Sequence, residues 1–141
     1  MVRSLKLAAL GLLIGLASAV TFGGCGSPTE PAPSALGTKT AAIGALEVKV
    51  TPIRLDATGA DVTIVFDTHT GAPTIDVATN TTLTVNGTPW KTLAWTGDGP
   101  GGHHRQGRVS FEAAGPSTGT AVLTVTGLAQ PVTFTWQLPP A

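Results

Sequence analysis

The three histidines of this chain lie in two short segments, and no other type of side chain in it ordinarily titrates near pH 7. Residues 67–69 read Asp-Thr-His, and residues 99–105 read Gly-Pro-Gly-Gly-His-His-Arg. Neutral imidazole nitrogens are good ligands for Zn²⁺, Cu²⁺ and Ni²⁺, and a carboxylate either binds such an ion or orients an imidazole. The pattern therefore predicts a divalent metal site for Cu or Zn, built from His69, His103, His104 and Asp67.

Two other interpretations of this region stay open. In the first, the histidines only form local hydrogen bonds in a glycine-rich loop that packs on a sheet, and Asp67 caps the N–H groups of a turn. In the second, the loop of residues 97–107 binds an envelope protein or a glycan together with Trp90 and Arg105. Trp90 follows a proline and is expected to be exposed, whereas Trp95 is expected in the core because of its place in the alternation.

Other classes of function are disfavoured by the residues present. No serine is expected on the strand-to-helix turn that exposes a nucleophile, and the acidic residues show no paired spacing, so we expect no enzyme. Without residues 1–24, six basic and eight acidic residues remain, a formal charge of −2. We therefore expect no nucleic-acid partner, because there is no basic patch to neutralise phosphates.

The elements that would position these residues are short strands. Apolar and polar residues alternate in segments that recur about every ten residues, separated by Gly, Pro, Asn and Asp. No stretch has a sustained helical period. The segments predict an all-β fold, a small immunoglobulin-like antiparallel β-sandwich of about seven strands. They are residues 46–55, 60–69, 82–85, 88–95, 108–112, 120–126 and 132–138. The expected core is Val48, Val50, Val62, Ile64, Phe66, Leu83, Val85, Trp95, Val109, Phe111, Leu123, Val125, Phe134 and Trp136.

The first 24 residues have the pattern of a signal peptide. Arg3 and Lys6 precede an uncharged apolar run of 14 residues, whereas a membrane-spanning helix needs about 20. Two cleavage positions are open, one after Ala19 and one before Cys25. Cys25 is the only cysteine of the chain, and a free thiol would be a liability in an oxidising compartment. This argument favours a modified Cys25.

Residues 21–25, Thr-Phe-Gly-Gly-Cys, resemble the lipobox of bacterial lipoproteins. The resemblance implies that Cys25 is lipidated and anchors the chain on the extracytoplasmic side of a membrane in the cell envelope. That membrane would be the outer one in a diderm cell, since glycine follows the cysteine. Residues 25–44, rich in Pro, Ser, Ala and Thr, predict a flexible tether, and residues 45–141 predict the β-domain. The Asp-Thr-His and Gly-Pro-Gly-Gly-His-His-Arg segments are also similar to uncharacterised exported β-domain proteins of prokaryotes, which implies no activity.

Overall fold

The computed structural model describes residues 36–71 and 73–140, so the predicted signal peptide and Cys25 lie outside the described residues. These residues form eight strands and one short helix. In chain order they are β1 (Lys39–Ile43), β2 (Leu46–Asp56), β3 (Gly59–Thr68), α1 (Val77–Asn80), β4 (Thr81–Val85), β5 (Thr88–Gly97), β6 (His104–Glu112), β7 (Gly119–Val125) and β8 (Val132–Leu138).

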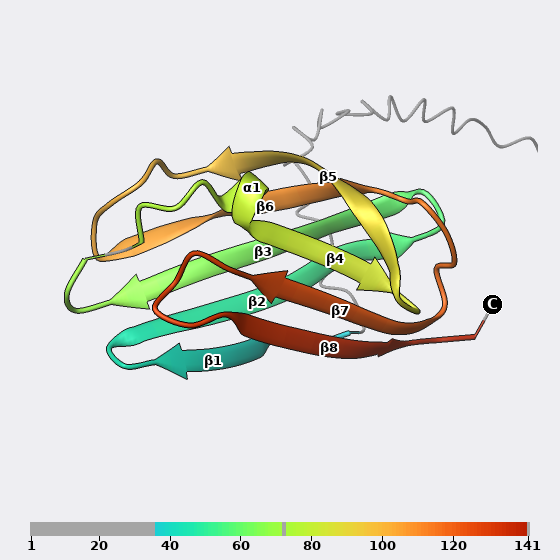
Figure 1. The fold of residues 1–141 in the computed structure, drawn as a ribbon, viewed down its shortest axis with the longest axis horizontal. Coiled ribbons are helices and arrows are strands. Elements are labelled where there is room, and N and C mark those ends of the chain that lie inside the picture. Colours follow the sequence, from blue (N-terminus) through green and yellow to red (C-terminus); the bar gives the residue numbers. More distant parts are fainter. Residues whose placement is uncertain (1–35, 72, 141) are drawn as a thin grey trace, which may run out of the picture.

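The strands form one antiparallel sheet in the order β1-β2-β3-β6-β5-β4-β7-β8, which folds over on itself into a nearly closed, barrel-like shape (Figure 1). β5 makes the fold-over possible, because its first residues pair with β4 and the rest pair with β6. The predicted all-β class is confirmed. The described residues contain eight strands instead of about seven, and the immunoglobulin-like sandwich is not confirmed.

The additional strand is β1, which lies inside the stretch that the composition predicts as a tether. It pairs with β2 along its whole length, from Lys39 opposite Val50 to Ile43 opposite Leu46. The segment shows no clear alternation, but it docks on an existing edge through backbone hydrogen bonds, and Ile43 packs against the core. Tertiary pairing therefore orders residues whose own pattern does not predict a strand.

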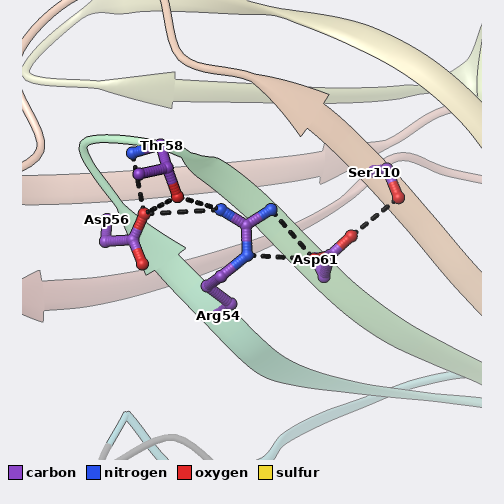
Figure 2. Close-up of polar contacts among 5 residues, drawn as sticks. All are labelled: Arg54, Asp56, Thr58, Asp61 and Ser110. Carbon is purple, nitrogen blue, oxygen red and sulfur yellow. Dashed lines mark hydrogen bonds and ion pairs between the residues drawn. The ribbon is translucent and has the colours of Figure 1, made fainter.

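The hairpin between β2 and β3 is held by a compact set of polar contacts (Figure 2). Asp56 accepts a hydrogen bond of 2.7 Å from the backbone N–H of Thr58, an arrangement typical of turns. Gly59 has a φ of +132°, and a Cβ there would lie 2.5 Å from the carbonyl oxygen of Phe111. Arg54 reaches back across the hairpin to Asp61. The turn therefore requires glycine for both its conformation and its close approach to β6.

Every residue expected in the core is buried except Trp95, which is only partly buried. Trp90, which was expected to be exposed, is only 3% exposed. The cause is a shift of register in β5 between Thr92 and Ala94, which leaves Leu93 exposed. An extra residue in a strand changes the parity of the alternation, so positions 90 and 95 both face inward. Without the bulge they would lie on opposite faces.

The two ends of the barrel differ in what they carry. At one end, called here the Lys39 end, β1 starts and β8 finishes. At the other, called the histidine end, lie the β1–β2 turn, the segment after β3, the β5–β6 loop and the β7–β8 turn (Figure 1, left of the view). All three histidines lie at this second end, because β3 stops at Thr68 and β6 starts at His104. The described chain thus begins at the end opposite the histidines.

Candidate functional site

Asp67 and His104 form a cross-strand pair at the histidine end. They lie directly opposite each other on β3 and β6, and His104 Nδ1 is 2.5 Å from Asp67 Oδ1. The hydrogen bond from His104 holds the pKa of Asp67 below its ordinary value, and the same bond raises the pKa of His104. Because an ionised carboxylate only accepts hydrogen bonds, Nδ1 carries the proton and Nε2 faces Gln106 Oε1 at 3.4 Å.

The pair continues as a row of charges onto β2. Glu47 lies opposite Asp67, and Lys49 Nζ is 2.8 Å from Glu47 and 3.3 Å from the second oxygen of Asp67. The hydrogen bond to Glu47, followed by that to Asp67, raises the pKa of Lys49. Both oxygens of Asp67 are therefore already engaged. Glu47 and Lys49 are not among the predicted site residues, although their polar places in an alternating strand mark them as outward-facing.

The other two histidines have different surroundings. His103 Nδ1 lies 3.3 Å from the carbonyl oxygen of Thr68, and the backbone N–H of Thr68 donates to the carbonyl of His103 at 2.9 Å. His69 follows directly after β3 and makes no hydrogen bond or ion pair within the described part of the chain. Each of the three imidazoles thus lies in an environment of its own.

A shallow hollow of about 470 Å³, called here the histidine hollow, brings part of the predicted site together. It is lined by Ala45, Glu47, Asp67, Thr68, His69 and His103. His104 is not among the lining residues, although its ring contacts Asp67, which is. Across residues 36–71 and 73–140, no group of three or more His, Cys, Asp or Glu side chains is placed to hold a metal ion. Two of the three predicted histidine ligands therefore share a hollow with Asp67, without converging.

Arg105, predicted as a binding residue, is buried and holds the loops of this end in place. It is 3% exposed, and its Nη1 donates hydrogen bonds of 2.9 Å to the carbonyl oxygens of Pro73 and Ile75. Its Nε donates to the carbonyl of Asp98 at 3.3 Å, and the guanidinium lies 5.5 Å from the ring centre of Trp95. Five donors in a planar fork suit a group that must satisfy several carbonyls at once. Arg105 therefore ties the segment after β3 to the β5–β6 loop.

The aromatic platform expected at Trp90 is absent from the surface. Trp90 is buried, and its Nε1 has no hydrogen-bond partner among the described residues. Trp95 donates its Nε1–H to the carbonyl of Asp98 at 3.0 Å, so its polar atom is also used internally. A ligand at this end would therefore contact polar loops and imidazoles in place of an exposed indole.

Ser117, which is not among the predicted site residues, lies in a Gly-x-Ser-x-Gly pattern at residues 115–119. In hydrolases with this motif, the serine sits on a sharp turn from a strand into a helix. Here the segment connects β6 to β7, so a strand follows it. It also lies at the Lys39 end, away from the histidines. The pattern therefore lacks the structural context that its chemistry requires.

The chain matches no family model, no curated protein and no solved structure. Within the described ranges, no helix is long and apolar enough to cross a membrane. The functional argument consequently rests on the residues and the geometry given above.

Proposed function

We propose that the chain is a lipid-anchored, extracytoplasmic lipoprotein whose β-domain is a binding module, with its binding surface at the histidine end. One observation carries the proposal: the described chain begins at the Lys39 end, and the histidine hollow lies at the opposite end. A lipid on Cys25 would hold the Lys39 end toward the membrane. The histidine end would then face away from it and remain accessible.

The distance from the anchor to the domain supports this arrangement. Fourteen peptide steps separate Cys25 from Lys39, and a chain of that length spans at most about 50 Å. The tether would therefore keep the domain within that distance of the membrane, attached through the end opposite the histidines. We also propose that the fold is an immunoglobulin-like sandwich. Among the described strands, β5 is the one that joins the half of the sheet ending at β6 to the half beginning at β4, as expected for two layers.

The partner that we favour is an envelope protein or glycan bound without a metal ion. The histidine hollow offers carboxylates, imidazoles and a threonine within one open depression, which suits a polar partner surface. Asp67 and His104 already satisfy each other, as His103 and Thr68 do. Asp67 and His103 are thus preorganised, and binding through them would cost little reordering.

The anchor can be tested by metabolic labelling with palmitate and by membrane fractionation. We expect the wild-type chain to carry label and to sediment with membranes, and the Cys25→Ser variant to be unlabelled and released in soluble form. A mature protein that begins at Val20 and carries no label would show cleavage after Ala19 and would refute the lipid anchor.

The binding surface can be tested by placing a photo-crosslinking residue at either end of the barrel in living cells. Replacing His69 places the probe in the hollow, and replacing Ser117 gives a matched control at the Lys39 end. We expect discrete crosslinked products from position 69 and not from position 117. The same products from both positions, or none from position 69, would contradict a binding surface at the histidine end.

A divalent metal ion is the second candidate, because His69, His103 and Asp67 line the same hollow and His69 has no partner among the described residues. Cu²⁺ or Zn²⁺ would require these side chains to turn toward one another. Isothermal titration with each ion should then give heat that a variant with all three histidines changed to alanine lacks. Equal heats for the two proteins would rule out this candidate.

A further inference from the structure

A second hollow lies on the outer face of the sheet, apart from the histidine end. It measures about 430 Å³ and is lined by Asp61, Thr96, Arg108 and Ser110. Asp61 on β3 lies opposite Ser110 on β6, and Arg108 on β6 lies opposite Thr96 on β5. The four residues therefore form a patch of two adjacent rows over three strands, called here the sheet-face hollow. It shares no lining residue with the histidine hollow.

The carboxylate of Asp61 is held in a fixed orientation (Figure 2). Its Oδ2 accepts hydrogen bonds from Arg54 Nε at 3.1 Å and Nη2 at 2.9 Å, and its Oδ1 accepts one from Ser110 Oγ at 2.7 Å. Burial raises the pKa of Asp61, but the hydrogen bonds from Ser110 and Arg54 and the charges of Arg54 and Arg108 together lower it. A carboxylate has about four acceptor sites, so three contacts leave room for another donor.

The side chain of Arg108 lines the same hollow, but no described acidic side chain forms an ion pair with it. It lies near enough to lower the pKa of Asp61, yet it forms no ion pair or hydrogen bond within the part of the chain that the structure describes. An exposed arginine close to a carboxylate often forms a surface ion pair with it. Instead, a guanidinium and a carboxylate line one hollow without closing on each other, and this leaves space between them.

We propose that the sheet-face hollow binds a neutral saccharide through a pair of adjacent ring hydroxyls. One hydroxyl would donate to Asp61 and the next would accept from Arg108, while the hydroxyl groups of Ser110 and Thr96 provide further polar contacts. Asp61 repels an anion, and Arg108 repels a cation. Among the described lining residues, the apolar groups open to a ligand are the methyl group of Thr96 and the aliphatic stem of Arg108. A neutral molecule rich in hydroxyl groups is the class that satisfies all four side chains.

This site does not depend on the function proposed for the histidine end, and either can fail without the other. No aromatic ring of the described residues lines the hollow to stack on a sugar, so we expect a dissociation constant on the order of 1 mM. Affinity of this order is effective when a tethered protein lies against a polymer with many repeated units. The pair of adjacent free hydroxyls that the hollow requires is found in a glucan, whereas an N-acetylated amino-sugar polymer carries an acetamido group in place of one of them.

The test is a ¹H–¹⁵N NMR titration of the mature chain carrying Cys25→Ser, with maltotetraose as the first probe and chitotetraose as the second. Maltotetraose has adjacent free hydroxyls at carbons 2 and 3 of each ring, whereas chitotetraose has an acetamido group at carbon 2. We expect saturable shifts at the amides of residues 61, 96, 108 and 110 with maltotetraose, and much weaker shifts with chitotetraose.

Arg108→Ala provides the decisive variant, because Arg108 is exposed and makes no hydrogen bond or ion pair with another described residue. We expect it to weaken maltotetraose binding at least about tenfold, the usual effect of losing a charged hydrogen bond. Lys91→Ala, which removes a cation of β5 outside the hollow, is the matched control and should bind as the wild type does. Unchanged binding by Arg108→Ala, no saturable shift with maltotetraose, or equal binding of chitotetraose would overturn the proposal.

Discussion

His104 and Asp67, 37 positions apart in the chain, are joined by a contact of 2.5 Å between Nδ1 and Oδ1 across adjacent strands. The pair lies on the outer face at the histidine end and is extended by Lys49 on the next strand. It links the two segments that the sequence marks as chemically distinctive. Replacing one residue of this pair therefore tests whether the histidine end has the same arrangement in solution.

Replacing Asp67 with asparagine should lower the pKa of His104 toward its ordinary value of 6.5, because the hydrogen bond to the carboxylate is the main cause that raises it. The measurement is a ¹H NMR titration of the imidazole protons, with the His104 signal assigned by a His104→Gln variant. Glu112→Gln, a change of another exposed acid that pairs with Lys91, should leave the titration of His104 unchanged. A His104 pKa that is unaffected by Asp67→Asn would show that the pair does not form in solution.

The same pair predicts how stability changes with pH. A histidine with a raised folded pKa contributes stability that is complete below its unfolded value of 6.5 and is lost as the pH rises through the folded value. Asp67, with a lowered pKa, contributes above its unfolded value of 3.8, and this is lost as the pH falls through the folded value. The stability difference between wild type and Asp67→Asn should therefore be largest between pH 3.8 and 6.5, as measured by urea unfolding. A difference that grows above this window would contradict the assignment.

Replacing Arg105 should destabilise the domain strongly. Arg105→Ala leaves the carbonyl oxygens of Pro73 and Ile75 without this donor, and the expected loss is about 3 kcal/mol in the free energy of unfolding. Arg105→Lys should recover only part of it, because an ammonium cannot reproduce the planar fork. Lys91→Ala, at an exposed ion pair, should change stability by less than about 1 kcal/mol. Equal effects of Arg105→Ala and Lys91→Ala would mean that Arg105 does not tie the loops together.

A methyl group at Gly107 should be poorly tolerated. An added Cβ would lie 2.5 Å from Trp95 Cζ2 and 2.7 Å from the carbonyl oxygen of Thr96. We expect Gly107→Ala to cost about 1–3 kcal/mol and to shift the fluorescence of Trp95. Gly99→Ala is the matched control, because a Cβ there meets no atom within 4 Å, and its effect should stay within about 0.5 kcal/mol. Similar stabilities of the two variants would refute the close packing of Trp95 over β6.

Trp90 should behave as a core residue. Trp90→Ala is expected to cost about 3–5 kcal/mol, because it empties the space of a large buried ring. Trp90→Phe should cost clearly less, since the indole N–H donates no hydrogen bond within the described structure that the change would break. Leu93→Ala, at the exposed bulge residue, should be nearly neutral. Unfolding curves in urea for the three variants measure these losses in the free energy of unfolding. A small loss for Trp90→Ala would mean that Trp90 is exposed in solution.

Much of the fold follows from local pattern alone. A strand with one buried face requires alternating apolar residues, and β2, β3, β7 and β8 show that alternation in their own sequence. The turn at Asn86 and Gly87 is likewise local, because both residues adopt positive φ, as this dipeptide favours. The all-β class and most of the core are therefore encoded in short segments.

Other features depend on contacts that no short segment contains. The bulge in β5 arises from its register against β6, and it turns Trp90 inward against the simple alternation. Arg105 looks like a surface residue in sequence, yet loop carbonyls about 30 positions away in the chain bury and satisfy it. Sequence alone cannot place such partners, because register and loop packing are set by the whole sheet.

For the candidate site, the sequence by itself determined which residues could carry chemistry, since histidines are few and lie in two segments. Only the tertiary structure decided which group each histidine meets. His104 contacts Asp67, His103 contacts the carbonyl oxygen of Thr68, and His69 has no partner among the described residues. The physical reason is that residue type sets what an imidazole can bind. Strand pairing and side-chain direction set which groups it meets, and these arise only when distant segments come together.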